Sequence, residues 1–173
     1  MGIGDLAFKK TYPALYGLYR NNFLPKNLQI VGYARSHIEL GDFRKRVSSK
    51  IKVHPGDDLD GFLNRCTYVS GKYDVDADYE RFAKELDQAE ADVPGHKNRL
   101  FYLALPPNVF ADASRGISKY LRTSKDLNQL IVEKPFGHDF DSSKELSKAL
   151  AQYWKEEEVW MLLSLTVTQW FLV

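Results

Sequence analysis

Four short apolar runs alternate with amphipathic segments along this chain. The runs cover residues 28–36, 66–74, 99–107 and 127–137. Their apolar residues are continuous rather than alternating, which is typical of strands buried on both faces of a parallel sheet. The pattern predicts an α/β fold of the doubly wound class, in which helices cover a parallel sheet.

The segments between the runs carry apolar side chains at helical spacing. Helices are predicted over residues 5–25, 37–51, 57–66, 76–91, 108–123 and 139–159. Pro13 predicts a kink or break in the first helix, and Pro25 a stop at its end. In the helix over 76–91, Tyr79, Phe82 and Leu86 form the expected inward face.

The C-terminal segment, residues 160–173, is strongly apolar and follows a charged helix. It is shorter than the roughly 20 residues that a membrane helix needs, and it contains polar side chains, so we predict no membrane anchor. An additional strand and an extension of the preceding helix are both compatible with its sequence.

Composition narrows the class of protein. The 173 residues are 44% apolar and 27% charged, as in one globular domain. The formal net charge of +1 argues against a nucleic-acid-binding surface driven by bulk charge. Cys66 is the only cysteine, which excludes an intramolecular disulfide and favours a reducing, cytoplasmic compartment. It lies where a helix gives way to a buried strand, so we interpret it as a core residue rather than a nucleophile.

No metal site or serine–histidine–acid set is evident. The histidines are His37, His54, His96 and His138. None has a metal-ligand spacing with Cys66 or a carboxylate, and we interpret the first three as solvated. His138 follows a glycine in a predicted turn.

Candidate ligand contacts follow from the fold class alone. Doubly wound sheets bind ligands beyond the carboxyl ends of their strands. The residues directly after the four runs are Arg35 and Ser36, Tyr73 and Asp74, Pro106 and Pro107, and Glu133, Lys134 and Pro135.

Arg35 is the most informative of these residues. In a dinucleotide fold this strand ends near the adenosine ribose, where an acid accepts from the 2′-hydroxyl of NAD and an arginine accommodates the 2′-phosphate of NADP. Within the predicted sheet Arg35 therefore indicates NADP, because a guanidinium pairs well with a phosphate. Without the sheet, a solvated arginine explains the residue equally well.

Two further segments suit a cofactor. The opening residues Gly2, Gly4 and Asp5 resemble a glycine turn before a helix, which binds anions. No strand precedes that turn, and a frayed terminus capped by Asp5 is the alternative interpretation. Lys134, beside Pro135, is placed to donate to a ligand; a surface lysine paired with its neighbouring glutamate is the alternative.

Several stretches combine into a family resemblance. The strings GDLAFKKTYPALYGLYRNNFLP, IVGYARS, RLFYLALPPNVF and LIVEKPFGHD occur in this order. Together they resemble the N-terminal coenzyme domain of glucose-6-phosphate dehydrogenase, over residues from about 4 to 159. That domain is roughly the first third of the family's usual chain.

The resemblance implies a Rossmann-like domain that binds NADP. The implied cofactor contacts are Gly2, Ile3, Gly4, Asp5, Leu6, Arg35, Ser36, Ala104, Leu105, Pro106, Phe110 and Lys134. Lys134 is also the implied contact to the substrate, glucose 6-phosphate. The family oxidises this sugar phosphate to 6-phosphogluconolactone with hydride transfer to NADP, the entry step of the pentose phosphate pathway, and it forms homo-oligomers.

The chain also departs from the family pattern. The family has a strand before the opening turn and, after residue 159, a run that holds the substrate phosphate; the general-base histidine follows later. Residues 1–159 are therefore predicted to form an incomplete NADP-binding domain whose first strand is missing, and residues 160–173 a tail unlike the family. We expect this chain to lack the catalytic base. It is therefore predicted to be a fragment of the enzyme, either a truncated isoform or a gene-model artefact. An inactive nucleotide-binding fragment is the alternative to an enzyme.

Overall fold

The computed structural model describes residues 7–133, 147–148 and 150–162. The chain divides into two compact units, Met1–Val93 and Pro94–Val173, which are described separately. The predicted contacts Gly2, Ile3, Gly4, Asp5, Leu6 and Lys134 lie outside the described residues, as do Pro135, His138 and residues 163–173.

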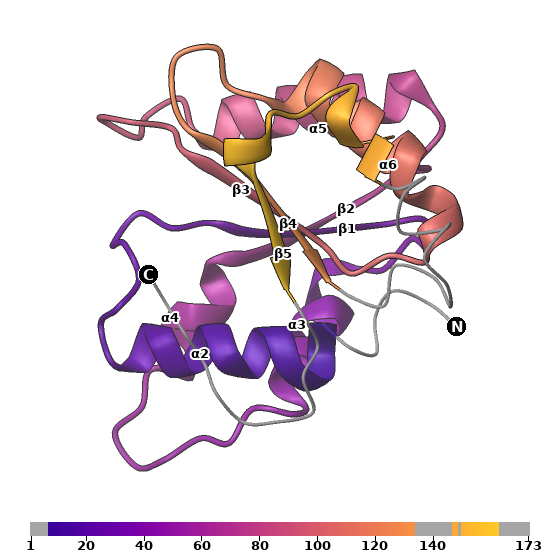
Figure 1. The fold of residues 1–173 in the computed structure, drawn as a ribbon. Helices are drawn as coiled ribbons and strands as arrows, with labels where there is room; N and C mark the ends of the chain where they lie inside the picture. The colour runs from indigo at the N-terminus through magenta and orange to yellow at the C-terminus, as the bar shows by residue number, and fades with distance from the viewer. Residues whose placement is uncertain (1–6, 134–146, 149, 163–173) are drawn as a thin grey trace. The chain divides into compact units, whose positions relative to one another are not determined.

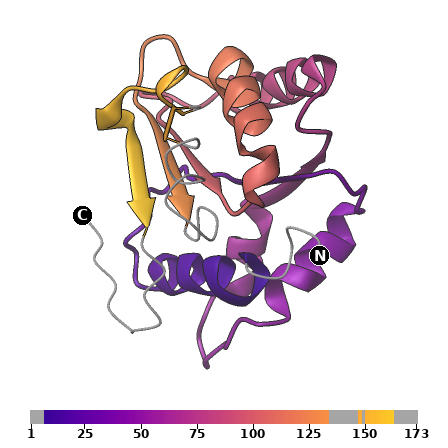
Figure 2. The same ribbon diagram turned by 45° about the vertical axis from the view of Figure 1, so that its right-hand side comes forward.

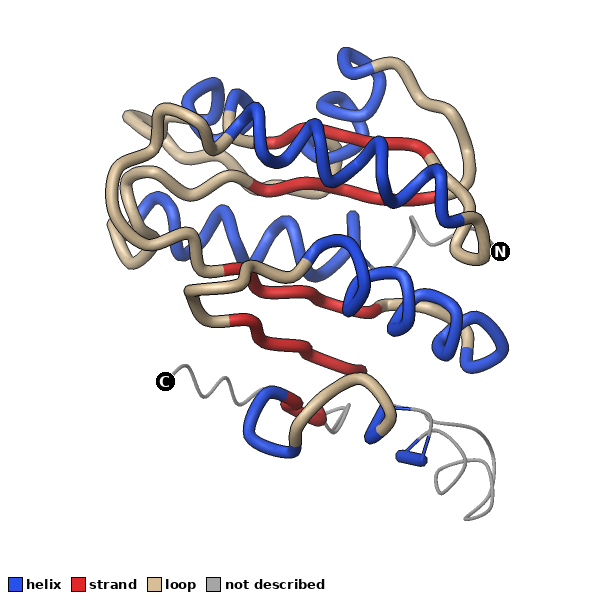
Figure 3. The backbone as a smooth tube through the Cα atoms, turned by 90° about the horizontal axis from the view of Figure 1, so that it is seen from above, coloured by secondary structure: helices blue, strands red, loops and turns tan. Residues whose placement is uncertain are grey.

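The first unit contains a pair of parallel strands, β1 (Ile30–Ala34) and β2 (Cys66–Ser70). Helices α3 (Leu40–Ser48) and α4 (Leu59–Asn64) lie between them in the chain. Figure 3 shows the two strands side by side, with a helical connection. The strand–helix–strand prediction is confirmed, although each strand is shorter than its apolar run.

One face of this strand pair carries an aromatic core. Helix α2 (Tyr12–Arg20), preceded by the π-helix η1 (Ala7–Thr11), packs there with α3 and α4. Figure 1 shows these helices on one side of β1 and β2. Gly32 of β1 permits the close packing, because an added Cβ would lie 3.1 Å from both the Phe43 ring and the Tyr12 hydroxyl.

The opposite face is covered by α5 (Asp76–Ala89). Side chains alternate along a strand, so Tyr33 points away from the face that Gly32 occupies. Its ring stacks on Phe82 of α5, with centroids 5.0 Å apart, and Tyr79 is buried beside it. Helices on both faces confirm the doubly wound α/β arrangement in this unit, with Tyr79 and Phe82 on the predicted inward face and Leu86 half-buried.

The second unit contains three parallel strands in the order β3-β4-β5. They are β3 (Arg99–Leu103), β4 (Asn128–Glu133) and β5 (Val159–Leu162). The 3₁₀ turn η2 (Pro107–Val109), helix α6 (Phe110–Gly116) and π-helix η3 (Ile117–Leu121) connect β3 to β4 and lie beside these strands in Figure 2. Leu100 is 61% exposed, so burial on both faces, as predicted for the run over 99–107, is wrong at this position.

The predicted helix over 139–159 ends too late. Residues 147–148 and 150–151 are helical, but Trp154 already lies outside the helix. Its indole N–H donates to the Ser114 hydroxyl at 2.9 Å, and the Arg122 guanidinium lies 4.7 Å from its ring. The chain then forms a 3₁₀ turn, η4 (Glu156–Glu158), and β5, which pairs with β4. Residues 160–162 thus belong to a strand that begins at Val159. The domain boundary predicted between residues 159 and 160 stays a prediction.

The first predicted helix also differs in detail. The helix type changes from π to α next to Pro13 without an interruption of the helical backbone, and the expected kink or break stays a prediction. The helix ends at Arg20, however, and the predicted stop at Pro25 is wrong. The reason is Asn22, whose φ of 59° places it in the left-handed region that ends helices.

Candidate cofactor-binding site

The carboxyl ends of β1 and β2 bring two predicted segments together. Arg35 and Ser36 follow β1 and are exposed, and residues 71–74 follow β2. The last residues of the two strands are paired in register, and the Gly71 N–H donates to the Ala34 carbonyl at 2.9 Å. The two segments therefore lie beside one another, as the parallel arrangement predicts.

A network of hydrogen bonds fixes the segment after β2. The Tyr33 hydroxyl donates to the Lys72 carbonyl at 2.9 Å, and the Lys72 N–H donates to Asp78 Oδ2 at 2.8 Å. Asp78 also forms an ion pair with Arg81 at 2.9 Å. The pKa of the Asp78 carboxyl is lowered first by the hydrogen bond from the Lys72 N–H and then by Arg81. Gly71 is required for the close approach, since an added Cβ would lie 2.3 Å from the Tyr33 hydroxyl oxygen. These contacts hold the backbone of Gly71 and Lys72 next to the end of β1.

The segment after β1 is held by tyrosines. The Tyr68 hydroxyl donates to the Ser36 carbonyl. Tyr73 is buried against the edge of the Tyr33 ring, and it lies near Arg35. No carboxylate pairs with the Arg35 side chain within the described part of the chain. The exposed guanidinium is therefore available to an anion.

In the second unit, three predicted contact residues directly follow the carboxyl end of strand β3. Ala104 and Leu105 are half-buried after β3, and Pro106 is exposed. The Val109 N–H donates to the Pro106 carbonyl at 3.1 Å, which closes the turn into α6. Phe110, the first residue of α6, is buried in the core of this unit. Cofactor contacts from these residues stay predictions.

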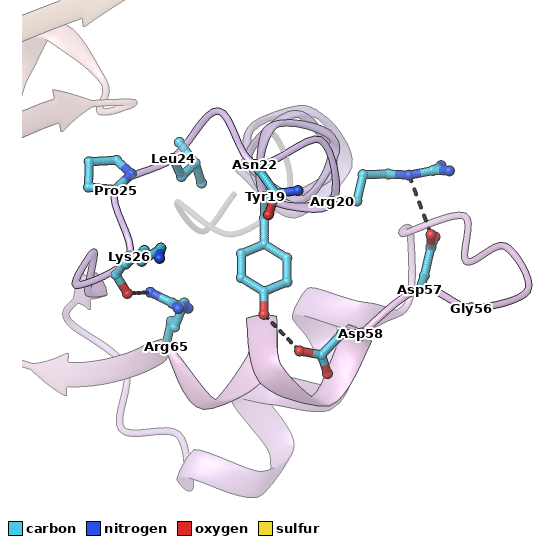
Figure 4. Close-up of a pocket in the computed structure, with 10 residues that line it drawn as sticks. All are labelled: Tyr19, Arg20, Asn22, Leu24, Pro25, Lys26, Gly56, Asp57, Asp58 and Arg65. Atoms are coloured by element: carbon cyan, nitrogen blue, oxygen red, sulfur yellow. Dashed lines mark hydrogen bonds and ion pairs between the residues drawn. The ribbon is translucent and has the colours of Figure 1, made fainter.

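A polar pocket of about 290 Å³ lies in the first unit but at the other end of its strands. Figure 4 shows its lining, which comprises Tyr19, Arg20, Asn22, Leu24, Pro25, Lys26, Gly56, Asp57, Asp58 and Arg65. Arg65 directly precedes β2 and donates to the Lys26 carbonyl, in the segment before β1. This pocket therefore lies at the amino ends of the strands, opposite the edge where doubly wound folds bind cofactors.

One residue of the candidate site was missed from the sequence. Tyr68 was assigned only to a buried strand, yet its hydroxyl anchors Ser36. The alternation along β2 indicates which face a side chain occupies. It does not indicate that a hydroxyl reaches a carbonyl 32 residues earlier in the chain.

The match to a family model covers most of the chain. Residues 2–162 match the model described as "Glucose-6-phosphate dehydrogenase, NAD binding domain". The chain belongs to this family. The predicted family resemblance is confirmed. The cofactor of this domain is a nicotinamide dinucleotide, as the description of the family model says.

Named relatives agree with the family model. The chain is 46% identical over 162 residues to glucose-6-phosphate 1-dehydrogenase of Emericella nidulans and 47% identical over 163 residues to that of Dictyostelium discoideum. Each alignment covers 92% of this chain and 32% of the relative, so the chain spans about a third of the length of these relatives.

Solved structures of the family have the same fold. One, described as glucose-6-phosphate dehydrogenase in complex with its substrate glucose-6-phosphate, matches with a TM-score of 0.87 and 41% identity. A second, glucose-6-phosphate 1-dehydrogenase from Mycobacterium avium, matches with a TM-score of 0.75 and 28% identity. Each match covers 92% of this chain and 34% of the solved chain.

The described residues offer no metal site and no membrane-spanning helix. Residues 7–133, 147–148 and 150–162 contain no group of three or more metal-ligating side chains and no helix long and apolar enough to cross a membrane. His37 and His96 are exposed and pair with Glu39 and Asp126, and His54 is exposed. The interpretation of these three histidines as solvated is confirmed.

Cys66 should be chemically inert in the folded protein. It is fully buried at the start of β2, its thiol lies 3.4 Å from the Phe62 carbonyl, and burial raises its pKa to about 12. Only the thiolate is nucleophilic, so we expect negligible labelling by a disulfide reagent at pH 8 and full labelling in denaturant. Rapid labelling of the native protein would contradict the interpretation of Cys66 as a core residue.

Asp58 should make the stability of the first unit depend on pH. It caps α4 by accepting from the Gly61 N–H at 2.8 Å, and it also accepts from the Tyr19 hydroxyl at 2.8 Å. These two bonds, the Gly61 bond first, lower the pKa of Asp58 below 3.8. A lowered folded-state pKa means that the ionised carboxylate stabilises the fold above the unfolded value, and that this stabilisation is lost as the pH falls through the folded value.

We therefore expect Asp58→Ala to lower the free energy of unfolding at pH 7, and the difference from wild type to shrink as the pH falls below the unfolded-state value of about 4. Urea unfolding at several pH values measures both effects. Asp60→Ala is the matched control, because Asp60 is exposed in the same first turn of α4. Equal effects of the two substitutions would show that charge at this helix end, rather than the cap, is responsible.

Proposed function

We propose that this chain provides the dinucleotide-binding domain of a glucose-6-phosphate dehydrogenase and that its cofactor is NADP. The observation that carries this proposal is Arg35, an exposed guanidinium without a carboxylate partner in the described chain, directly beyond β1. An acid at this place would suit the ribose 2′-hydroxyl of NAD, whereas a guanidinium suits the 2′-phosphate of NADP. The residues present therefore fit a phosphorylated nicotinamide dinucleotide.

The proposed reaction is the oxidation of glucose 6-phosphate to 6-phosphogluconolactone. The names of the relatives and the solved complex with glucose 6-phosphate support it. The bound cofactor would accept the hydride. We propose that this chain binds and orients the cofactor, with Arg35 and Ser36 at the ribose phosphate. Ala104, Leu105, Pro106 and Phe110 stay predicted cofactor contacts, and Lys134 a predicted contact to both cofactor and sugar.

A second candidate is nucleotide binding without turnover. This candidate needs only the domain that the family model describes, the NAD binding domain. In either case we propose a cytoplasmic location, which suits a single buried, reduced cysteine, and association between copies as in the family.

Calorimetric titration of the purified chain with NADP and with NAD tests the cofactor proposal. We expect saturable binding of NADP and weaker binding of NAD. Equal affinities, or no binding of either, would overturn the assignment of NADP. Adding glucose 6-phosphate and following NADPH absorbance then separates the two candidates, since steady NADPH formation requires an enzyme and a flat trace with intact binding indicates the inactive form.

A further inference from the structure

Tyr73 has an unusual position at the candidate site. It lies beyond the carboxyl end of β2, next to the Arg35 segment beyond β1. The residue is only 4% exposed, and its hydroxyl has no hydrogen-bond partner among the described residues. A buried hydroxyl without a partner destabilises a fold, because the group loses its bonds to water and gains none.

The surroundings hold Tyr73 beside Arg35. Its ring lies edge-on to Tyr33, with centroids 5.9 Å apart, and Tyr33 is itself stacked on α5 and bonded to the Lys72 carbonyl. Burial raises the pKa of Tyr73 to about 12, and the nearby Arg35 guanidinium opposes that rise. Among the described residues, a hydroxyl without an acceptor and a guanidinium without a carboxylate partner thus lie at one edge of the strand pair.

We propose that the Tyr73 hydroxyl is a second donor to the phosphate that Arg35 binds, and that it contributes to the preference for a 2′-phosphorylated cofactor. This inference rests on the proposed function. The Arg35 side chain is exposed, so a phosphate bound to it would lie beside Tyr73 and would supply an acceptor for the hydroxyl. A donor held in place before binding loses little entropy on binding.

Tyr73→Phe removes only the hydroxyl and keeps the ring contact with Tyr33. We expect the Kd for NADP to rise about 10-fold to 100-fold, as for loss of a hydrogen bond to an ionised group, with the Kd for NAD unchanged. We also expect a thermal midpoint that is unchanged or higher, because the buried hydroxyl has no partner to lose among the described residues. A merely structural role would lower that midpoint.

Tyr16→Phe is the matched control. Tyr16 is as deeply buried in the same unit but packs on Phe62 near the amino ends of the strands. The Tyr16→Phe variant should therefore have the wild-type Kd for NADP. An unchanged Kd for NADP in Tyr73→Phe, while Arg35→Glu weakens binding, would overturn this inference and leave the proposed cofactor standing. Equal weakening of NADP and NAD would also overturn it. A wild-type chain that does not distinguish the two cofactors would overturn the proposed function itself.

Discussion

Replacing Arg35 with glutamate should remove most of the affinity for NADP and leave the affinity for NAD close to its original value. A hydrogen bond between charged groups contributes about 1.5–3 kcal/mol, and tenfold in Kd corresponds to about 1.4 kcal/mol. Loss of the guanidinium alone then raises the Kd for NADP about 10-fold to 100-fold. The new carboxylate adds repulsion of the 2′-phosphate, so we expect the effect at or beyond the upper end of this range.

The response to NAD makes the experiment selective. A carboxylate at the end of this strand accepts from the ribose 2′-hydroxyl, so Arg35→Glu should bind NAD as well as wild type does, or better. Both Kd values should be measured at one ionic strength, because salt screens exposed charges. Lys52→Glu, which reverses an exposed charge beyond the C-terminal end of α3, should leave the ratio of the two Kd values unchanged. A parallel loss of NADP and NAD binding in Arg35→Glu would point to misfolding or to a different role for Arg35.

The parallel strands and the place of Arg35 were predictable because both depend on local patterns. Continuous apolar runs that end in polar residues identify parallel strands, and parallel strands present those polar residues at one edge. Arg35 and Tyr73 are both found at such an edge of the first unit.

Features that depend on contacts between distant residues were not predictable. The Tyr68 hydroxyl reaches the Ser36 carbonyl, and the Tyr73 hydroxyl has no partner among the residues that the structure describes, only because of how the chain packs. The end of α2 depends on the left-handed backbone of Asn22, which its residue type permits but does not require. Similarly, the acidic run before Val159 suits a helix by composition, whereas pairing with β4 makes the following residues a strand.

Phe43→Ala should be among the most destabilising single changes in the first unit. The Phe43 side chain is 1% exposed, and its ring contacts those of Phe8, Tyr12 and Tyr68 at centroid distances of 5.9, 5.8 and 5.0 Å. Truncating a buried phenylalanine costs about 3–5 kcal/mol, against a total stability of about 5–15 kcal/mol for a typical domain. Urea unfolding measures the loss, and Phe23→Ala, at a position 75% exposed, should cost less than about 0.5 kcal/mol.

The same substitution should also weaken NADP binding by the molecules that remain folded. Tyr68 packs on Phe43 and holds the Ser36 carbonyl next to Arg35, so removing the ring loosens the segment that presents the guanidinium. Phe62 is equally buried but packs on Tyr16 and Tyr19, near the amino ends of the strands. Phe62→Ala should therefore destabilise the unit to a similar degree without changing the Kd of its folded fraction. A wild-type Kd for NADP in both variants would contradict this prediction. It would show that the contact between Tyr68 and Phe43 does not affect how Arg35 binds the cofactor.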